Sequence, residues 1–372
     1  MENMTKKILF ISQTILLKNT GGGLVSEKTL DLLTQTFDCV DVLLLGDKNI
    51  SFSFNNKVID FRTKYSKRNT FLNHLLGLST GINLCIYYKI KQLLKKEQYD
   101  VIFFDSSVFG RITRYAKKHT NSKLITYYHN IEADFSKDFY KHGGLPYYPI
   151  YRNAVYNEKL ASKYTDYIFL INKEEETRLN LLYNRKIDLC LPVSLNYDGR
   201  ATNFQKMAEK LNILFVGSNF FANIEGITWF IKNVMPHIDA GLTIVGKGME
   251  QSLVSFSSDK IKVLGYVNNL AEVYAQHQIV IVPIFSGAGM KVKIAEAFSY
   301  GKYVLTTDFA FSGYEKQEGI ATICDNARQF IEAINSYPVS DYFLPEAVNY
   351  FQKYYSQKAV LLKLKQFVEE IL

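Results

Sequence analysis

Short, mostly apolar runs of strand length recur along the chain, and segments with helical spacing separate them. Runs that are apolar on both faces are typical of parallel strands covered by helices on each side. They lie at 7–14, 40–46, 99–104, 123–128, 166–171, 212–217, 241–246, 261–265, 279–283, 302–307 and 319–323. Because strand and helix alternate in both halves, the pattern predicts an α/β chain with two doubly wound parallel-sheet domains.

The length of the chain agrees with two domains. Its 372 residues exceed the roughly 250–300 that one hydrophobic core serves. A polar stretch rich in turn formers, 191–210, predicts the boundary, which gives domains at 1–200 and 201–345. The remaining residues, 346–372, read as a C-terminal helix that caps the second domain or crosses back onto the first.

The charge is unevenly distributed. Residues 1–200 hold 29 basic and 20 acidic side chains, whereas 201–372 hold 15 and 16. The excess is concentrated at 51–125, with 14 basic against 4 acidic side chains. Such a surface suits nucleic acid, acidic lipid headgroups or a phosphorylated acceptor, and the alternative is a solvated face without a partner. Tyr and Phe interleaved with the basic residues favour a membrane interface over a nucleic-acid groove.

The cysteines and the N-terminal segment indicate where in the cell the protein is expected. Cys39, Cys85, Cys190 and Cys324 form no C-x-x-C pair, so neither a zinc site nor a disulfide framework is predicted and a cytosolic location is expected. The apolar run 8–17 reads as a first strand and not as a signal peptide. No apolar stretch is long enough to predict a membrane span.

Polar and small residues follow two of the predicted front-half strands. In open parallel sheets ligands bind at the carboxyl ends of the strands, so these positions are candidate site residues. Gly21–Gly23 follow the first strand and would let backbone N–H groups approach an anion, although a plain tight turn is the alternative. His129, Asn130 and Glu132 follow the strand at 123–128.

The segment after the strand at 279–283 carries the strongest signal. Small, flexible residues lead into a helix predicted from near Met290 through Tyr300. Lys293 and Glu296 share one face of that helix. Lys293 and the free backbone donors at the helix start suit a diphosphate, and the Glu296 carboxylate suits a ribose diol. The alternative is an ordinary surface ion pair.

Three pieces of the back half, 213–238, 245–248 and 263–305, resemble the donor-binding domain of GT-B-fold glycosyltransferases of family 4, the retaining group. The front half is similar more loosely, through its glycine loop, the H-N-x-E of 129–132, and 157–176. The resemblance implies two Rossmann-like domains facing a central cleft. It also implies transfer of a sugar from a nucleotide-diphosphate donor, retention at the sugar, and no metal or other cofactor.

The resemblance also implies roles for individual residues. His129, Lys293 and Glu296 would be catalytic, with His129 on the transferred sugar, Lys293 on the diphosphate and Glu296 on the nucleotide ribose. Asn130 and Glu132 are candidates for binding the acceptor or the sugar. The further donor-binding residues would be Gly22, Gly23, Gly217, Lys247, Gly287, Ala288, Gly289 and Met290.

The sequence departs from the common family pattern at three positions. The first of two family carboxylates would fall at Ala288, and a family Arg and Lys are replaced by Ser218 and Glu225. The subgroup with a G-A-G-M block shows the same simplification. These departures leave Lys293, helped by Lys247 or Lys291, as the principal cation for the leaving group.

The sequence therefore predicts a hexosyltransferase-type enzyme at the cytosolic face of the membrane, active in bacterial surface polysaccharide or lipopolysaccharide synthesis. Its expected partners are a nucleotide-diphosphate sugar, a saccharide or lipid-linked acceptor and an anionic membrane surface contacted through 51–125. Three alternatives stay open: a nucleotide-sugar epimerase of the same fold, a non-catalytic sugar-nucleotide-binding partner and, least favoured, a nucleic-acid-binding protein.

Overall fold

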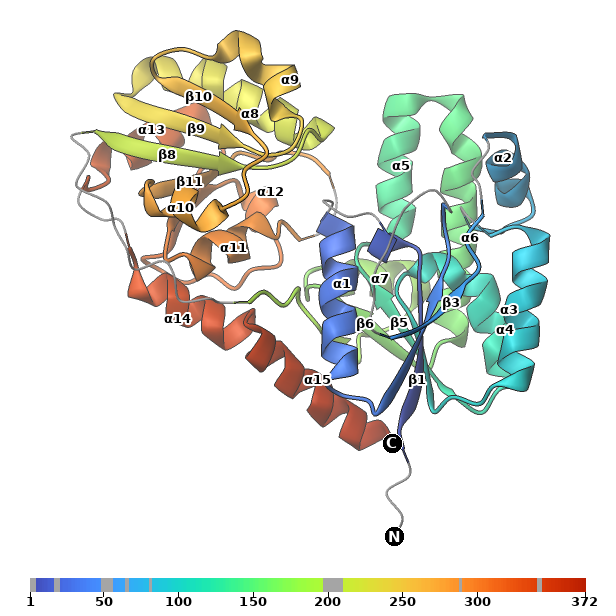
Figure 1. The fold of residues 1–372 in the computed structure, drawn as a ribbon. Helices are drawn as coiled ribbons and strands as arrows, with labels where there is room; N and C mark the ends of the chain where they lie inside the picture. The colour runs from blue at the N-terminus through green and yellow to red at the C-terminus, as the bar shows by residue number, and fades with distance from the viewer. Residues whose placement is uncertain are drawn as a thin grey trace. The chain divides into compact units, whose positions relative to one another are not determined.

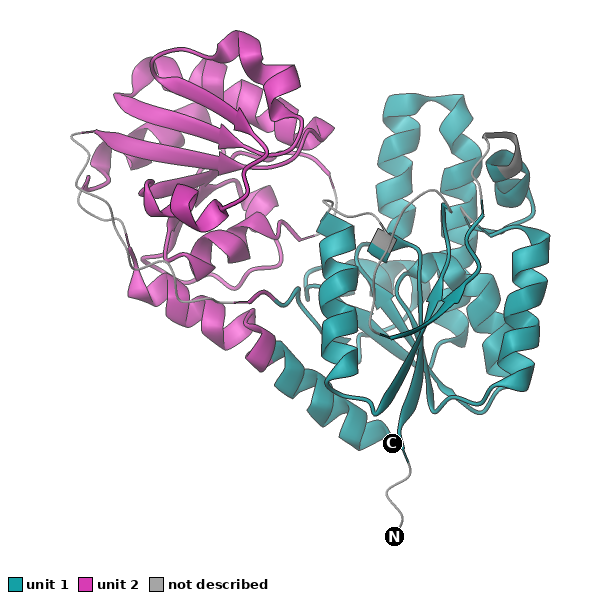
Figure 2. Cartoon of the chain, viewed as in Figure 1, with its two compact units in different colours: residues 1–194, 360–372 teal, residues 195–359 magenta. Residues whose placement is uncertain are grey.

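The computed structural model divides into two compact units, Met1–Ser194 with Val360–Leu372, and Leu195–Ala359 (Figure 2). It describes residues 5–16, 21–47, 56–63, 67–79, 82–196, 210–287, 290–339 and 343–372. None of the helices formed by these residues is long and apolar enough to cross a membrane.

The first unit is built on a parallel sheet with the strand order β3-β2-β1-β4-β5-β6-β7 (Figure 1). Its strands are β1 (Lys7–Ser12), β2 (Cys39–Leu44), β3 (Lys57–Asp60), β4 (Val101–Phe104), β5 (Lys123–Tyr128), β6 (Tyr167–Leu170) and β7 (Leu189–Cys190). The five apolar runs predicted in this half all form strands. The edge strands β3 and β7 were not predicted, because neither is an apolar run buried on both faces.

The helices of this unit lie on and around the sheet (Figure 1). They are α1 (Gly21–Thr34), α2 (Lys67–Leu75), α3 (Leu84–Lys96), α4 (Gly110–His119), α5 (Glu132–Gly143), α6 (Tyr148–Tyr164), α7 (Glu175–Tyr183) and α15 (Gln357–Ile371), with short 3-10 turns η1 (Thr14–Leu16), η2 (Ser107–Phe109) and η3 (Leu145–Tyr147). In α15, the Phe367 ring packs edge-on against Tyr167 and Phe169, with centroids 5.3 and 5.0 Å away. These contacts join the last helix of the chain to β6.

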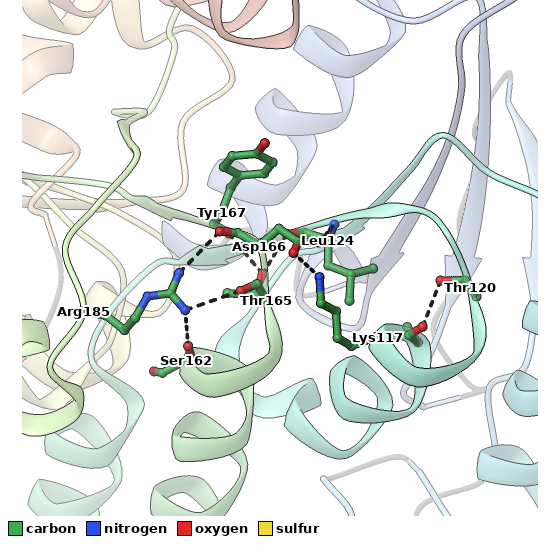
Figure 3. A network of polar contacts seen from close by, with 9 residues as sticks. Lys117, Thr120, Leu124, Ser162, Thr165, Asp166, Tyr167 and Arg185 are labelled. Atoms are coloured by element: carbon green, nitrogen blue, oxygen red, sulfur yellow. Dashed lines mark hydrogen bonds and ion pairs between the residues drawn. The ribbon is translucent and has the colours of Figure 1, made fainter. Parts of the chain in front are cut away.

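A polar network fixes the starts of β5 and β6 (Figure 3). The Asp166 carboxylate accepts from the Leu124 amide at 3.0 Å and from the Lys117 ammonium. The Arg185 guanidinium donates to the Ser162 and Thr165 carbonyls, 2.5 and 3.4 Å away. Since these groups come from α4, β5, α6 and the segment after α7, the network ties four parts of the unit together.

The second unit contains a parallel sheet in the order β10-β9-β8-β11-β12-β13. The strands are β8 (Leu211–Val216), β9 (Ala240–Val245), β10 (Ile261–Gly265), β11 (Ile279–Val282), β12 (Tyr303–Thr306) and β13 (Ala321–Ile323). All six match runs predicted from the sequence, so the expected α/β class with two doubly wound parallel sheets is confirmed.

The helices of this unit include α8 (Phe221–Asn233), α9 (Met249–Leu253), α10 (Leu270–Ala275), α11 (Lys293–Ser299), α12 (Asp308–Phe311), α13 (Ala327–Ser336) and α14 (Pro345–Tyr354), with 3-10 turns η5 (Met235–His237) and η6 (Val254–Phe256). The sequence predicted one C-terminal helix over 346–372. The structure has two helices there, α14 and α15, because Tyr355 leaves the helical conformation, with φ −124° and ψ −6°.

Helix α8 packs so closely on the segment after β11 that a side chain at Gly226 would not fit. A Cβ at Gly226 would lie 1.9 Å from the Pro283 carbonyl oxygen. This close approach sets the distance between α8 and the segment that leads to α11.

We predict that Gly226→Ala lowers the free energy of unfolding of the second unit by about 3 kcal/mol, because the backbone must move to admit the methyl group. Urea unfolding measures the effect. Gly21→Ala is the matched control, since a Cβ at that helix start has no atom within 4 Å, and it should change stability by less than about 1 kcal/mol. Equal losses in both variants would contradict the packing argument.

Candidate functional site

Each sheet has a topological switch point beside its first strand. In the first unit β1 lies between β2 and β4, and in the second unit β8 lies between β9 and β11. The chain moves outward from that strand in both directions, so the loops at the carboxyl ends diverge there and leave room for a ligand. The predicted site residues follow strands next to these two points.

Lys293 lies at the switch point of the second unit. Its Nζ donates a 2.7 Å hydrogen bond to Asn223 Oδ1 and lies 4.6 Å from the centroid of the Phe215 ring. Asn223 in turn donates from Nδ2 to the Ser218 carbonyl at 2.8 Å. The Asn223 amide thus joins the first residue of α11 to the loop that follows β8.

Gly217 makes this arrangement possible. A Cβ at that position would lie 2.8 Å from Lys293 Nζ and 3.0 Å from Asn223 Cγ. Any side chain at 217 would displace the lysine. The structure therefore brings together Gly217 and Lys293, which the sequence predicted as parts of one donor site.

The lysine is not an ordinary surface ammonium. Burial, and then the charge of the nearby Lys291, lower the pKa of Lys293 to about 7, while Glu296 acts in the opposite direction. Near neutral pH the group therefore exchanges readily between its charged and neutral forms. An anion that binds beside it would favour the charged form.

Glu296 lies one turn further along α11. Its Oε2 accepts a 3.1 Å hydrogen bond from the Tyr274 hydroxyl, and the Tyr274 ring stacks on Tyr300 with centroids 4.3 Å apart. Burial raises the pKa of Glu296, while the Tyr274 hydrogen bond and Lys293 partly offset that rise. Neither Lys293 nor Glu296 is an exposed side chain, so the alternative of a surface ion pair is wrong.

The start of α11 differs from the prediction. The helix begins at Lys293 and not near Met290. At the observed start, Ile294 N donates to the Lys291 carbonyl at 2.9 Å and Ala295 N to the Tyr314 hydroxyl at 3.1 Å. The free backbone donors expected near Met290 stay a prediction.

The other predicted donor-binding residues lie at the same edge of the sheet. Lys247 is exposed in the loop after β9, where its carbonyl accepts from the Asn219 amide at 3.0 Å. Gly287 has a φ of 96°, a conformation that favours glycine, and Met290 is buried. Ala288 and Gly289 lie outside the described residues.

In the first unit, three neighbouring strands end in polar side chains that contact one another. His129 follows β5, and its Nε2 lies 3.0 Å from Asp105 Oδ1 just after β4. The Ser12 hydroxyl, at the end of β1, donates to the other Asp105 oxygen. Asp105 therefore holds the imidazole through one oxygen and is itself held through the other.

Asn130 and Glu132 lie beside a second buried carboxylate, Glu158 of α6. Asn130 Nδ2 donates to Glu132 Oε1 at 3.2 Å, and the amides of Glu132 and Ala133 donate to Glu158 at 2.7 and 3.0 Å. Ser107 and Tyr183 hydroxyls complete the Glu158 site. Burial, and then the Glu158 charge, raise the pKa of Glu132 to about 7.

Gly22 and Gly23 belong to the first turn of α1, which begins at Gly21. The alternative of a plain tight turn at these glycines is therefore wrong. Their N–H groups stand at the start of a 14-residue helix, after residues 17–20, which are outside the described part of the chain.

Several residues that shape the site were missed from the sequence: Ser12, Asp105, Glu158, Asn223 and Tyr274. Ser12 and Asp105 could have been found by the rule that identified His129, since both stand at strand ends. The other three lie within helices, and no local pattern distinguishes them from structural residues. Among the described residues, no group of three or more His, Cys, Asp or Glu side chains is arranged to hold a metal ion.

Residues 210–337 match the family described as Glycosyl transferases group 1. The matched residues make up most of the second unit, which is therefore similar to this family. This match confirms the resemblance stated from 213–305. The chain is also 20% identical, over 95% of its length and 92% of the other protein, to a Klebsiella pneumoniae protein described as an uncharacterized 44.6 kDa protein in the cps region.

Solved structures of low sequence identity share the fold of the whole chain. Sucrose-phosphate synthase from Thermosynechococcus elongatus is 17% identical, with a TM-score of 0.74 over 98% of this chain and 99% of that one. Anabaena HepE in complex with UDP and glucose is 14% identical, with a TM-score of 0.69 over 98% and 100%. The lipopolysaccharide outer core galactosyltransferase WaaB is 13% identical, with a TM-score of 0.70 over 98% and 100%. The chain has the GT-B fold, as the sequence predicted.

The depressed pKa of Lys293 predicts a pH-dependent cost to stability. The unfolded chain binds a proton at this lysine up to about pH 10, whereas the folded unit releases it near pH 7. The free energy of unfolding of the parent therefore rises as the pH increases from 7 to 10. Lys293→Met removes this cost. The difference in free energy of unfolding between Lys293→Met and the parent should therefore be larger at pH 7 than at pH 9.5, by on the order of 3 kcal/mol. Urea unfolding across this range measures it. The exposed Lys262→Met is the control, and a flat difference for Lys293→Met would contradict the assignment.

The raised pKa of Glu132 predicts that stability changes with pH in the opposite direction. Its folded pKa lies above the ordinary value of 4.5, so the folded unit loses stability as the carboxyl ionises between about pH 4.5 and 7. Glu132→Gln should gain roughly 1–3 kcal/mol over the parent as pH rises from 5 to 8. The exposed Glu27→Gln, on α1 of the same unit, should show no such trend in the same denaturation series. A gain for Glu132→Gln that does not change with pH would be inconsistent with a buried, titrating carboxyl.

Proposed function

We propose that the chain is a glycosyltransferase that moves a sugar from a nucleotide-diphosphate sugar to a saccharide or lipid-linked acceptor. The observation that carries the proposal is the arrangement at the switch point of the second unit. There a half-buried lysine and a half-buried carboxylate lie on one short helix, each held by one neutral side chain. The match of residues 210–337 to the Glycosyl transferases group 1 family supports the same assignment.

The lysine suits the charge that the reaction develops. When the bond between the anomeric carbon and the diphosphate oxygen breaks, the nucleoside diphosphate leaves with added negative charge, and the acceptor hydroxyl bonds to the anomeric carbon and loses its proton. Lys293 in its ammonium form neutralises part of that charge, in a partly desolvated place where the interaction is stronger than in water. Asn223 fixes the Nζ before the reaction begins, so little reorganisation is needed.

The carboxylate suits a hydroxylated ligand. Glu296 accepts one hydrogen bond from Tyr274 and retains further acceptor capacity for a pair of ribose hydroxyls. Gly217 gives a nucleotide close access to the backbone after β8. Lys247 and the segment Gly287–Met290 complete the donor site in this proposal.

The residues of the first unit are assigned to the sugar and the acceptor. We assign His129 to the transferred sugar, with Asp105 orienting the imidazole, and Asn130 and Glu132 to sugar or acceptor hydroxyls. We assign Gly22 and Gly23 to the donor diphosphate, because helix starts favour anions.

The donor nucleotide, the transferred sugar and the pathway are assigned from solved structures that resemble this chain. The HepE complex contains UDP, which makes a UDP-sugar the first donor to test, and WaaB is described as a lipopolysaccharide galactosyltransferase. We therefore propose transfer of a hexose in bacterial surface polysaccharide or lipopolysaccharide synthesis, in the cytosol, with retention at the anomeric carbon. We also propose that Lys293 meets the charge of the leaving group without a metal ion.

Turnover of UDP-sugars with an acceptor extract tests the proposal. The protein should release UDP, and Lys293→Ala and Glu296→Ala should each lower the rate at least about 100-fold, because each removes a group that acts on the donor. Lys262→Ala and Glu318→Ala are matched controls at exposed positions of the same unit and should retain the parent rate. A chelator should leave turnover unchanged.

Several outcomes would overturn the assignment. Full turnover in both Lys293→Ala and Glu296→Ala would place the donor elsewhere. Conversion of the nucleotide sugar without any acceptor would identify an epimerase. Binding of the nucleotide sugar without turnover, across a panel of acceptors, would identify a non-catalytic binding protein.

A further inference from the structure

Helix α2 exposes its large apolar side chains and buries a polar one. Among its described side chains the buried one is His74, which is 7% exposed, whereas Phe71, Leu72 and Leu75 are 50, 47 and 62% exposed. Leu76, just after the helix, is 48% exposed. An amphipathic surface helix normally turns its apolar side chains inward, so this helix presents to its surroundings the face that would otherwise form a core.

Buried polar groups of α6 hold α2 in this orientation. Asn153 Nδ2 lies 2.7 Å from His74 Nδ1 and donates to the Leu78 carbonyl at 2.8 Å. Asn157 Nδ2 donates to the Gly77 carbonyl at 3.0 Å. Burial lowers the pKa of His74, in keeping with a neutral imidazole that accepts from the amide. The contacts that orient α2 are polar, and its apolar side chains make the outer surface.

Exposed apolar side chains of neighbouring helices extend this surface. The Tyr156 ring of α6 borders the turn after α2, since a Cβ at Gly77 would lie 2.9 Å from it, and Tyr156 is exposed. Arg111 donates to the Leu76 carbonyl and stacks over Tyr87 of α3 at 5.2 Å, which joins the end of α2 to α3. Figure 1 shows α2 beside α6. We define the α2 patch as the exposed side chains of Phe71, Leu72, Leu75, Leu76 and Tyr156, together with the exposed Leu84 and Tyr88 of α3.

The segment that forms α2 and α3 has charged residues of one sign. Between Asp60 and Glu97 the chain has no acidic residue, while it contains eight Lys and Arg. The exposed stripe of α3 begins with Leu84 and Tyr88 and continues through Lys89 to Lys95 and Lys96. A cluster of exposed aliphatic and aromatic side chains, in a segment whose charged residues are all basic, is complementary to a bilayer that carries anionic lipids.

We propose that the α2 patch docks on an anionic membrane surface. The apolar side chains of α2 enter the boundary between headgroups and acyl chains, and lysines of α3 contact the lipid phosphates. This inference narrows the expectation for 51–125 to one helix and its neighbours. It does not depend on the proposed glycosyl transfer, so either can fail without the other.

Co-sedimentation with vesicles tests the docking surface. The full chain should bind vesicles of phosphatidylcholine with about one-third phosphatidylglycerol more tightly than phosphatidylcholine alone, with a preference that weakens as salt rises. Leu72→Gln/Leu75→Gln should weaken binding to the anionic vesicles at least about tenfold, because two inserted side chains are lost. Leu181→Gln/Leu182→Gln is the matched control, since these leucines are 76 and 38% exposed on α7 of the same unit, and it should bind like the parent.

A second readout does not require a change in the patch. Cys85 is exposed beside Leu84, so a polarity-sensitive fluorophore on it should shift to shorter wavelength with anionic vesicles. The shift should vanish when Cys85→Ser is labelled in the same way. Circular dichroism should show that Leu72→Gln/Leu75→Gln is folded, since both side chains are exposed.

Three results would overturn the proposal. The first is equal binding of the parent to neutral and anionic vesicles. The second is unchanged binding of Leu72→Gln/Leu75→Gln together with no fluorescence shift at Cys85. The third is a parent dimer in light scattering that Leu72→Gln/Leu75→Gln converts to a monomer without any effect on vesicle binding, which would assign the patch to a second copy of the chain.

Discussion

The hydrogen bond between Lys293 and Asn223 is the interaction on which the candidate site depends. It places the lysine Nζ beside the backbone that follows β8, at the topological switch point where the strand order of the second unit reverses. The arrangement requires glycine at 217, because a side chain there would meet the Nζ. It also requires the close packing of α8 at Gly226, since α8 carries Asn223. The close packing at Gly217 and Gly226 therefore fixes the position of Lys293 Nζ.

Both units keep ionisable groups partly desolvated at the carboxyl edges of their sheets. Lys293 and Glu132 have pKa values shifted to about 7 in opposite directions, and in both cases burial is the largest cause. Such groups lower the stability of the unliganded fold, which selection for stability alone would not favour. A bound diphosphate would stabilise the charged lysine, and a hydroxylated ligand would supply hydrogen bonds to the carboxyl. The proposed function therefore assigns a ligand to each of the groups that cost stability.

The sequence predicts the framework well because buried parallel strands leave runs that are apolar on both faces, and every such run became a strand. It fails for β3 and β7, which are short edges of the sheet without that pattern. His129, Lys293 and Glu296 were predicted as site residues, and the structure places each beside a strand end or switch point. The partners that orient them, Asp105, Asn223 and Tyr274, depend on contacts between elements distant in the chain, which no local spacing encodes. The start of α11 was placed about one turn too early, and the Tyr314 hydroxyl that accepts from the Ala295 amide comes from beyond β12, so no local spacing indicates it.

Calorimetry of UDP binding tests the central claim that Lys293 is the cation for the diphosphate. With a free pKa of about 7, the lysine is mostly neutral at pH 8, and a bound diphosphate should return it to the ammonium form. Titrations at pH 8 in two buffers of different ionisation enthalpy should therefore show uptake approaching one proton per UDP, and Lys293→Arg should abolish the uptake because arginine stays charged. UDP binding with no proton uptake, or with the same uptake in Lys293→Arg, would contradict the account.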